Sequence, residues 1–128
     1  MTNLDQVEGL VASQLTHRHM SGLPATGTVG DIRDFFSKSD SRRLAVLVDG
    51  DRYVGSIGRD QLPDDADPEA PATGLAKAGP VADPQMAAAA ARDLALSEPS
   101  WRLPVVGADG VFRGVIAVDP DKGEFCGT

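Results

Sequence analysis

The chain has few cysteines, few basic residues and no long hydrophobic run, and each shortage excludes a class of protein. Its 128 residues include one cysteine, Cys126, which excludes an intramolecular disulfide and a thiolate metal site. A free thiol is typical of a reducing compartment, so we expect a cytoplasmic protein. Lys and Arg number 12 against 19 Asp and Glu, and the formal charge of −7 disfavours nucleic acid and membrane surfaces as partners. No apolar run approaches the roughly 18 residues of a membrane span, and the first residues lack the features of a signal peptide.

The sequence also lacks the residue combinations of an active site. It contains no recognisable nucleophile–base pair, no glycine-rich phosphate loop and no pair of carboxylates expected to be buried. His17 and His19 have no carboxylate at helical spacing, which disfavours a metal site and leaves a weak pH sensor as the alternative. Cys126 has no adjacent His or Lys that would activate its thiol. We therefore expect a protein that is not an enzyme and holds no metal.

What the sequence does contain is an internal duplication. The stretch Arg43–Gly50 is echoed by Arg102–Gly110, and Tyr53–Ile57 is echoed by Phe112–Ile116. A period of 59 is shared by apolar and glycine positions, which marks a duplication rather than chance similarity. This period aligns Leu44 with Leu103, Val46 with Val105, and Gly55 with Gly114. Two similar units are expected to pack about a pseudo-twofold axis, with a cleft between them for a ligand.

Periodicity and breaker residues divide the chain into five segments. An amphipathic helix is predicted within residues 1–20, because apolar residues recur at steps of three and four at Leu4, Val7, Val11 and Leu15. Repeat one is predicted over 21–62 and repeat two over 74–120. Between them, residues 63–73 form a linker rich in Pro and Asp, and residues 121–128 are interpreted as a tail.

Each repeat is predicted to contain a helix followed by a strand, a turn and a second strand. In repeat one, Thr28 is expected to cap a short helix with Asp31 at position N3, and strands are expected at 44–48 and 53–57. In repeat two, Asp83-Pro84 is expected to begin a helix that continues over Met86–Leu96. Its strands are expected at 103–106 and 111–118.

These patterns resemble the cystathionine-β-synthase (CBS) domain, a module that nearly always occurs as a tandem pair called a Bateman module. The strongest piece is the run W-R-L-P-V-V at Trp101–Val106, followed by Gly110 and by Gly114-Val115-Ile116. The matching stretches are Thr28–Leu62 and Pro80–Asp119, so the resemblance covers most of the chain after residue 20.

The resemblance implies an α/β (α+β) fold with two β-α-β-β-α repeats in a pseudo-twofold disc, here with an added N-terminal helix. Discs of this family commonly dimerise, so a homodimer is expected. The resemblance also implies a regulatory role, in which an adenosine-type ligand such as AMP, ADP, ATP or S-adenosylmethionine binds in the cleft between the repeats.

The chain departs from the family's ribose-binding pattern, G-h-h-T-x-x-D, in both repeats. The Thr and Asp positions of that pattern hold Gly58 and Gln61 in repeat one, and Ala117 and Pro120 in repeat two. Asp60 and Asp119 each lie one position early, where they are either displaced ribose ligands or turn residues. A nucleotide would thus lose orienting hydrogen bonds worth roughly 1.5–3 kcal/mol each when a charge takes part.

Two sets of candidate ligand-binding residues follow from the resemblance. The set in repeat two keeps the better apolar shelf for adenine and consists of Val81, Ala82, Asp83, Leu103, Pro104 and Asp119. Its counterparts in repeat one are Pro24, Ala25, Thr26, Leu44, Ala45 and Asp60. Arg59 and Arg102 are interpreted as either phosphate ligands or solvated side chains.

Two functions remain open at this point. The first is a small stand-alone regulatory module that binds an adenosine-type ligand between its repeats. The second is a dimeric scaffold that binds no ligand and interacts with a protein partner, and the altered ribose motifs favour it.

Overall fold

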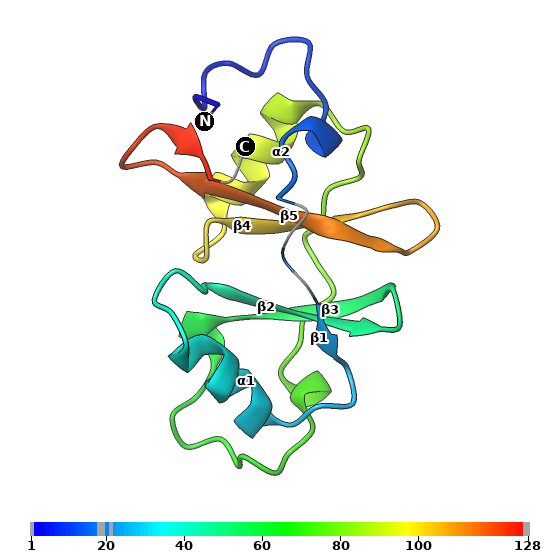
Figure 1. Ribbon diagram of the computed structural model, residues 1–128, viewed down its shortest axis with the longest axis vertical. Coiled ribbons are helices and arrows are strands. Elements are labelled where there is room, and N and C mark those ends of the chain that lie inside the picture. Colours follow the sequence, from blue (N-terminus) through cyan, green and yellow to red (C-terminus); the bar gives the residue numbers. More distant parts are fainter. Residues whose placement is uncertain (1, 18–19, 21, 127–128) are drawn as a thin grey trace. The chain divides into compact units, whose positions relative to one another are not determined.

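A computed structural model describes residues 2–17, 20 and 22–126, which form two compact units. One unit, here called the central unit, is the continuous stretch Gly22–Gly79. The other, here called the split unit, combines the described residues before position 22 with residues 80–126. The chain therefore leaves the split unit after its first segment and returns to it after completing the central unit (Figure 1).

The central unit is a three-stranded sheet with one α-helix. Strand β1 (Leu23–Pro24) pairs in parallel with β2 (Leu44–Asp49), which pairs antiparallel with β3 (Arg52–Gly58). Helix α1 (Val29–Ser37) packs against β2 and buries Val29, Ile32 and Phe36. Short 3₁₀ turns, η2 (Arg59–Gln61) and η3 (Ala72–Gly74), follow the sheet.

The predicted cap of α1 is confirmed. Thr28 Oγ1 accepts a hydrogen bond from the Asp31 backbone N–H at 3.3 Å, and Asp31 Oδ2 accepts one from the Thr28 N–H at 3.0 Å. This capping box satisfies two backbone donors that the first turn of a helix would otherwise leave unpaired. The helix therefore begins where the sequence places it.

The split unit also consists of a sheet with one α-helix, but the strands at the edges of its sheet differ from those of the central unit. Strands β4 (Arg102–Val106), β5 (Phe112–Asp119) and β6 (Glu124–Phe125) form an antiparallel sheet. Ala82 adds a parallel bridge to Val105, at the place that β1 occupies in the central unit. Helix α2 (Ala88–Ser97) packs on β4 and β5, and the 3₁₀ turn η1 (Ala12–Gln14) contacts α2 (Figure 1).

Each unit is completed by a segment that we call a strap. Strap one, residues 2–17, belongs to the split unit, and strap two, residues 62–77, belongs to the central unit. The straps are equivalent: Val11 bridges Ala87 before α2, and Pro71, 60 positions later, bridges Thr28 before α1. The duplication thus extends into the straps, and each strap precedes one repeat in sequence but packs with the other.

Gly55 and Gly114 are equivalent glycines on β3 and β5, and each lies where a strap crosses its strand. In the split unit, His17 and Val115 exchange backbone hydrogen bonds of 2.8 and 3.3 Å. A Cβ on Gly114, whose φ is +133°, would lie 2.6 Å from the His17 carbonyl oxygen. In the central unit, a Cβ on Gly55 would lie 3.1 Å from the Lys77 carbonyl oxygen. These glycines therefore permit close approach of two backbones, which explains their place in the repeat.

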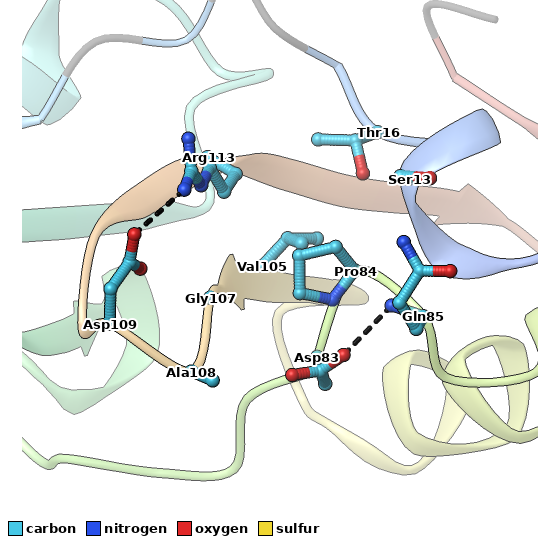
Figure 2. Close-up of a pocket in the computed structure, with 10 residues that line it drawn as sticks. All are labelled: Ser13, Thr16, Asp83, Pro84, Gln85, Val105, Gly107, Ala108, Asp109 and Arg113. Carbon is cyan, nitrogen blue, oxygen red and sulfur yellow. Dashed lines mark hydrogen bonds and ion pairs between the residues drawn. The ribbon is translucent and has the colours of Figure 1, made fainter.

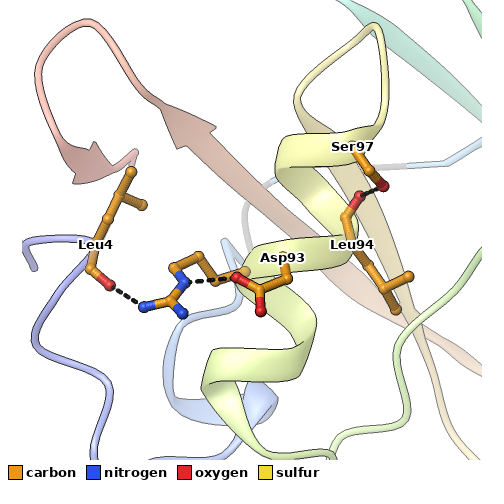
Figure 3. Close-up of polar contacts among 5 residues, drawn as sticks. Leu4, Asp93, Leu94 and Ser97 are labelled. Atoms are coloured by element: carbon orange, nitrogen blue, oxygen red, sulfur yellow. Dashed lines mark hydrogen bonds and ion pairs between the residues drawn. The ribbon is translucent and has the colours of Figure 1, made fainter.

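An arginine on each helix holds the corresponding strap. Arg33 on α1 donates through Nη2 to the carbonyl oxygens of Pro63, Asp64 and Ala66 at 3.0, 2.9 and 2.8 Å. Arg92 on α2 lies 59 positions later and donates through Nη1 to the Leu4 carbonyl at 2.9 Å (Figure 3). The same helix position therefore anchors both straps.

Pairing register corrects the alignment of the first strands. Leu47 pairs with Gly55 in the central unit, and Val105 pairs with Gly114 in the split unit. Leu47 and Val105 are therefore equivalent and lie 58 positions apart, so the period of 59 that aligns Leu44 with Leu103 holds for β3 and β5 but is wrong for β2 and β4. The turn that follows β4 is one residue longer, which restores the period.

The predicted N-terminal amphipathic helix is wrong. Strap one contains only η1, and Gly9 adopts a φ of +77°, which interrupts any helix. Its apolar residues are nevertheless buried, with Val7 at 7% and Leu15 at 2% exposure. The hydrophobic spacing therefore serves a non-helical segment whose backbone is bound by its neighbours rather than by its own turns.

The helix of repeat two begins later than predicted. The Ala12 N–H donates to the Met86 carbonyl at 2.8 Å, and Val11 bridges Ala87, so strap one holds residues 86–87 outside the helix. Asp83 caps no helix; its Oδ1 instead accepts the Gln85 N–H at 2.8 Å in a local turn. Helix α2 therefore starts at Ala88.

The C-terminal segment also differs from expectation. The stretch interpreted as a tail contains β6, and Phe125 is fully buried in the core of the split unit. Neither unit contains a second α-helix within the described residues. In the central unit, η2 and strap two follow β3 directly.

Candidate functional site

The split unit contains a hollow of about 800 Å³, within the usual range of ligand pockets. Three elements enclose it: strap one, the loop between Ala82 and α2, and the turn between β4 and β5 (Figure 2). Its lining residues are Ser13, Thr16, Asp83, Pro84, Gln85, Val105, Gly107, Ala108, Asp109 and Arg113.

Charged groups of both signs meet in this hollow. Arg113 Nη2 donates to Asp109 Oδ2 at 2.9 Å, and Asp109 Oδ1 also accepts the Val111 N–H at 3.1 Å. The Asp83 carboxylate lies on the opposite loop, beside the Pro84 ring and the Gln85 amide (Figure 2). Among the described residues, the hollow therefore offers one guanidinium and two carboxylates beside apolar and neutral polar groups.

The central unit has an equivalent hollow of about 570 Å³ with a different lining. Pairing of Leu23 with Leu47 and of Ala82 with Val105 makes Pro24 equivalent to Asp83. By the same period, Ala25 and Thr26 correspond to Pro84 and Gln85, and Val54 corresponds to Arg113. The pairing of candidates expected from the sequence, in which Val81 corresponds to Pro24, is therefore displaced by two residues.

The structure divides the predicted ligand-binding residues between hollows and cores. Asp83 lines the hollow of the split unit, and Pro24, Ala25 and Thr26 line that of the central unit. The apolar candidates of the strands are buried, with Ala82, Leu103 and Ala45 at 0% exposure and Leu44 at 6%. Pro104 is also buried, and Val81 is half-buried. Burial leaves Ala82, Leu103 and Ala45 little surface to present to a ligand.

The two candidate ribose carboxylates occupy different surroundings. Asp119 Oδ1 accepts the backbone N–H groups of Asp121 and Lys122 at 3.1 and 3.3 Å, so it caps the turn between β5 and β6. Asp60 is exposed in the first turn of η2. Asp119 thus has a structural role that leaves its second oxygen for another partner.

The two candidate phosphate-binding arginines are used inside their units. Arg59 Nε donates to the Arg42 carbonyl at 2.8 Å, its Nη2 reaches the carbonyls of Phe36 and Ser39, and its guanidinium covers the Phe36 ring. Arg102 Nη1 donates to the Trp101 carbonyl at 3.2 Å. Arg59 therefore joins the end of β3 to the end of α1, and Arg102 also reaches the Val118 carbonyl on β5 at 3.5 Å.

No metal site or membrane helix emerges from the part of the chain that is described. Within residues 2–17, 20 and 22–126, no three His, Cys, Asp or Glu side chains come together to hold a metal. His17 pairs its backbone with Val115, whereas His19 lies outside the described residues. Cys126 is a partly exposed free thiol. None of the described helices has the length and hydrophobicity of a transmembrane helix.

Sequence reasoning missed Ser13, Thr16, Gln85, Asp109 and Arg113 as lining residues. A signal for Arg113 was present, because the period of 59 aligns it with Val54 and thus marks a charge that repeat one lacks. No comparable signal existed for Ser13 and Thr16, since strap one was interpreted as a helix.

Comparison with known proteins supports the fold. No family model matches the sequence, and neither does any curated protein. A cystathionine β-synthase pair domain from Shewanella oneidensis MR-1 superposes with a TM-score of 0.71 and 22% identity, covering 88% of this chain and 68% of that one. The CBS domains of a transcriptional regulator from Streptococcus pneumoniae give 0.71 and 18% identity, covering 84% and 92%.

A third solved structure carries a ligand. The cytosolic domain of the Mg²⁺ channel MgtE in complex with ATP gives a TM-score of 0.68 and 19% identity, over 94% of this chain and 50% of that one. The mixed α+β fold expected from the repeated R-L-x-V-V pattern is thus confirmed. The chain has the fold of a tandem CBS domain pair.

Proposed function

We propose that this chain is a small cytoplasmic regulatory module that senses an adenosine-type ligand. The observation that carries the proposal is the fold, which it has in common with CBS pairs that include a domain solved in complex with ATP. AMP, ADP, ATP and S-adenosylmethionine are the candidate ligands.

The repeat-two residues are the preferred site. Asp119 supports this choice, because only its Oδ1 is used by the turn and Oδ2 can accept a hydrogen bond from a ribose hydroxyl. Val81, which is half-buried, would supply an apolar contact from the same set of residues. This site stays a prediction until a ligand is bound.

A second function is a dimeric scaffold that binds a protein partner and no nucleotide. It is favoured by Gln61, which occupies the position of the family's ribose carboxylate. Gln61 Oε1 accepts the Gly58 N–H at 3.0 Å, so its side chain turns back on the strand end. Arg59 is likewise engaged with backbone carbonyls and does not offer its charge to a phosphate.

A thermal-shift screen with AMP, ADP, ATP, S-adenosylmethionine and NAD at millimolar concentration separates the two functions. A ligand at 100 times its Kd adds about 2.7 kcal/mol to the unfolding free energy and raises the midpoint by several degrees. A rise with one compound supports sensing. No rise with any of the five contradicts it and favours the scaffold.

The Asp119 variants then test the site. Asp119→Ala should weaken binding about tenfold, the scale of one charged hydrogen bond. Asp119→Asn keeps an oxygen for the Asp121 and Lys122 N–H groups and serves as the control for the turn. Unchanged affinity in both variants removes Asp119 from the site. Solution mass at low micromolar concentration tests the homodimer, and a monomer there contradicts it.

A further inference from the structure

The hollow of the split unit differs in charge from its equivalent in the central unit. Arg113, Asp83 and Gln85 stand where the central unit has Val54, Pro24 and Thr26. The described lining of the central hollow has one charged residue, Asp49, whereas that of the split-unit hollow includes a guanidinium and two carboxylates. This difference between equivalent hollows points to a ligand that only the split-unit hollow recognises.

The polar groups of this hollow retain unused bonding capacity. Arg113 commits one N–H to Asp109 and has a side chain that is 51% exposed, so its other donors face outward. Asp83 commits Oδ1 to the Gln85 N–H, which leaves Oδ2 as an acceptor. Asp109, in contrast, already accepts hydrogen bonds from Arg113 Nη2 and from the Val111 N–H, so its role is to orient the guanidinium group.

The balance of charge restricts the ligand. The described lining residues include two carboxylates, Asp83 and Asp109, beside the Arg113 guanidinium, within a chain of net charge −7. A polyphosphate would meet the Asp83 carboxylate there, and its binding is disfavoured. A simple cation would leave the free Arg113 donors unmatched. A compound with both a carboxylate and an ammonium group can accept hydrogen bonds from Arg113 and donate one to Asp83.

We propose that the hollow of the split unit binds a free α-amino acid, at a site that shares Asp83 with the adenosine-type candidates but is otherwise lined by different residues. The ligand's carboxylate accepts from Arg113, and its ammonium group donates to Asp83 Oδ2. Its side chain lies toward Pro84 and Ala108, the apolar lining residues that keep exposed surface. Both ends of the ligand are thereby held by charge-assisted hydrogen bonds.

Strap one contributes to the same site. Ser13 and Thr16 line the hollow, and the Thr16 hydroxyl donates to the Ala12 carbonyl at 2.8 Å, which fixes that part of the strap. An occupant therefore contacts strap one and the rest of the split unit at once. Binding should raise the stability of the split unit and slow amide exchange in strap one.

The test is a thermal-shift screen of the full chain with each standard L-amino acid at about 10 mM, a concentration that gives several degrees for a Kd near 0.1 mM. Titration calorimetry follows for the best compound, together with its N-acetyl and methyl ester derivatives. We expect one or a few amino acids to bind and both derivatives to fail, because each derivative lacks one of the two charges.

Two variants locate the binding. Arg113→Val, which installs the central-unit residue, and Asp83→Asn should each weaken binding about tenfold or more. Asp49→Asn alters the equivalent hollow of the central unit and should leave affinity unchanged. Arg113→Gln also removes the charge and replaces Arg113→Val if that variant fails to fold. The proposal is overturned if no amino acid shifts the wild-type midpoint, or if binding survives in both hollow variants. The nucleotide screen is a separate measurement, and its outcome does not decide this one.

Discussion

The two units hold equivalent straps by different physical means. Strap one contributes Val7 and Leu15 to the hydrophobic core of the split unit, and Leu4 and Leu10 pack against that core. Strap two is rich in Pro and Asp and contributes fewer apolar side chains, chiefly Ala72 and Leu75. It is bound instead by three carbonyl hydrogen bonds from Arg33, where Arg92 makes one with strap one.

This difference teaches that the duplicated feature is the backbone path and not the side chains. The Val29 N–H donates to the Ala70 carbonyl at 2.9 Å, and the Ala88 N–H donates to the Leu10 carbonyl at the same distance. Hydrogen bonds between backbone groups can form whatever the side chain, except that proline has no N–H to donate. One strap could therefore become polar while its equivalent stayed apolar.

The largest expected effect comes from the leucines at equivalent positions in the two straps, Leu15 and Leu75. Leu15→Ala should lower the unfolding free energy by about 3 kcal/mol, because Leu15 is 2% exposed. Leu75→Ala should cost about 1 kcal/mol, since Leu75 is only partly buried. Urea unfolding followed by far-ultraviolet circular dichroism measures both. Equal losses would contradict a difference in strap burial.

The next largest loss of stability is expected at Gly114 and Gly55, the glycines at which a strap crosses a strand. Gly114→Ala should cost about 3 kcal/mol, because the new Cβ meets the His17 carbonyl and the φ of +133° strains any L residue. Gly55→Ala should cost about 1 kcal/mol, since its contacts of 3.1 Å need only a small shift. Trp101, the only tryptophan, reports unfolding of the split unit by fluorescence. A Gly55→Ala loss as large as that of Gly114→Ala would refute this ranking.

Substitution of the arginines that bind the straps should give the opposite ranking from the leucines. The loss of stability should be larger for the arginine that binds strap two, Arg33, than for Arg92. Arg33→Met removes three hydrogen bonds to carbonyls and should cost about 2 kcal/mol. Arg92→Met removes one hydrogen bond to a carbonyl and the ion pair with the exposed Asp93, and should cost about 1 kcal/mol. Methionine keeps the aliphatic volume of the side chain. Urea midpoints of the two variants decide the order, and a larger loss for Arg92→Met would show that hydrogen bonding does not hold strap two.

The smallest effect is a titration in the central unit. Burial raises the pKa of Tyr53, although a hydrogen bond to Ser56 partly opposes this. The folded pKa lies above the unfolded value near 10, so the stability from Tyr53 is complete below that pH and is lost as the pH rises through the folded pKa. Tyr53 is the only tyrosine, so absorbance near 295 nm follows its ionisation alone. A midpoint at or below 10 would contradict its burial.

The sequence predicted those parts whose structure depends on neighbouring residues. Hairpin strands, the Thr28 capping box and the glycine positions are local patterns, and each appears in the structure. The straps could not be predicted in the same way, because Ala12 and Leu15 are placed by partners more than 70 positions away, such as Met86. The start of α2 failed for the same reason.

The hollow of the split unit lay beyond sequence reasoning for a related cause. Asp83, Asp109 and Ser13 come from three separate segments, and only tertiary pairing brings them together. Asp83 is the one residue of this lining among the ligand-binding candidates expected from the sequence, whereas the helix predicted within residues 1–20 assigns Ser13 no role in a pocket. Only Arg113, as a charge against Val54 of the other repeat, carried information that the duplication itself supplied.

The division of the split unit has a consequence for synthesis. Strap one leaves the ribosome before its partners, which begin at residue 80, so 63 positions separate residue 17 from the rest of its core. At about 5–20 residues per second, the strap waits roughly 3–13 s. The central unit is continuous and can fold in that interval. During the wait, Leu4, Val7 and Leu15 are a short apolar segment on a nascent chain, which we expect chaperones to bind before the split unit closes over it.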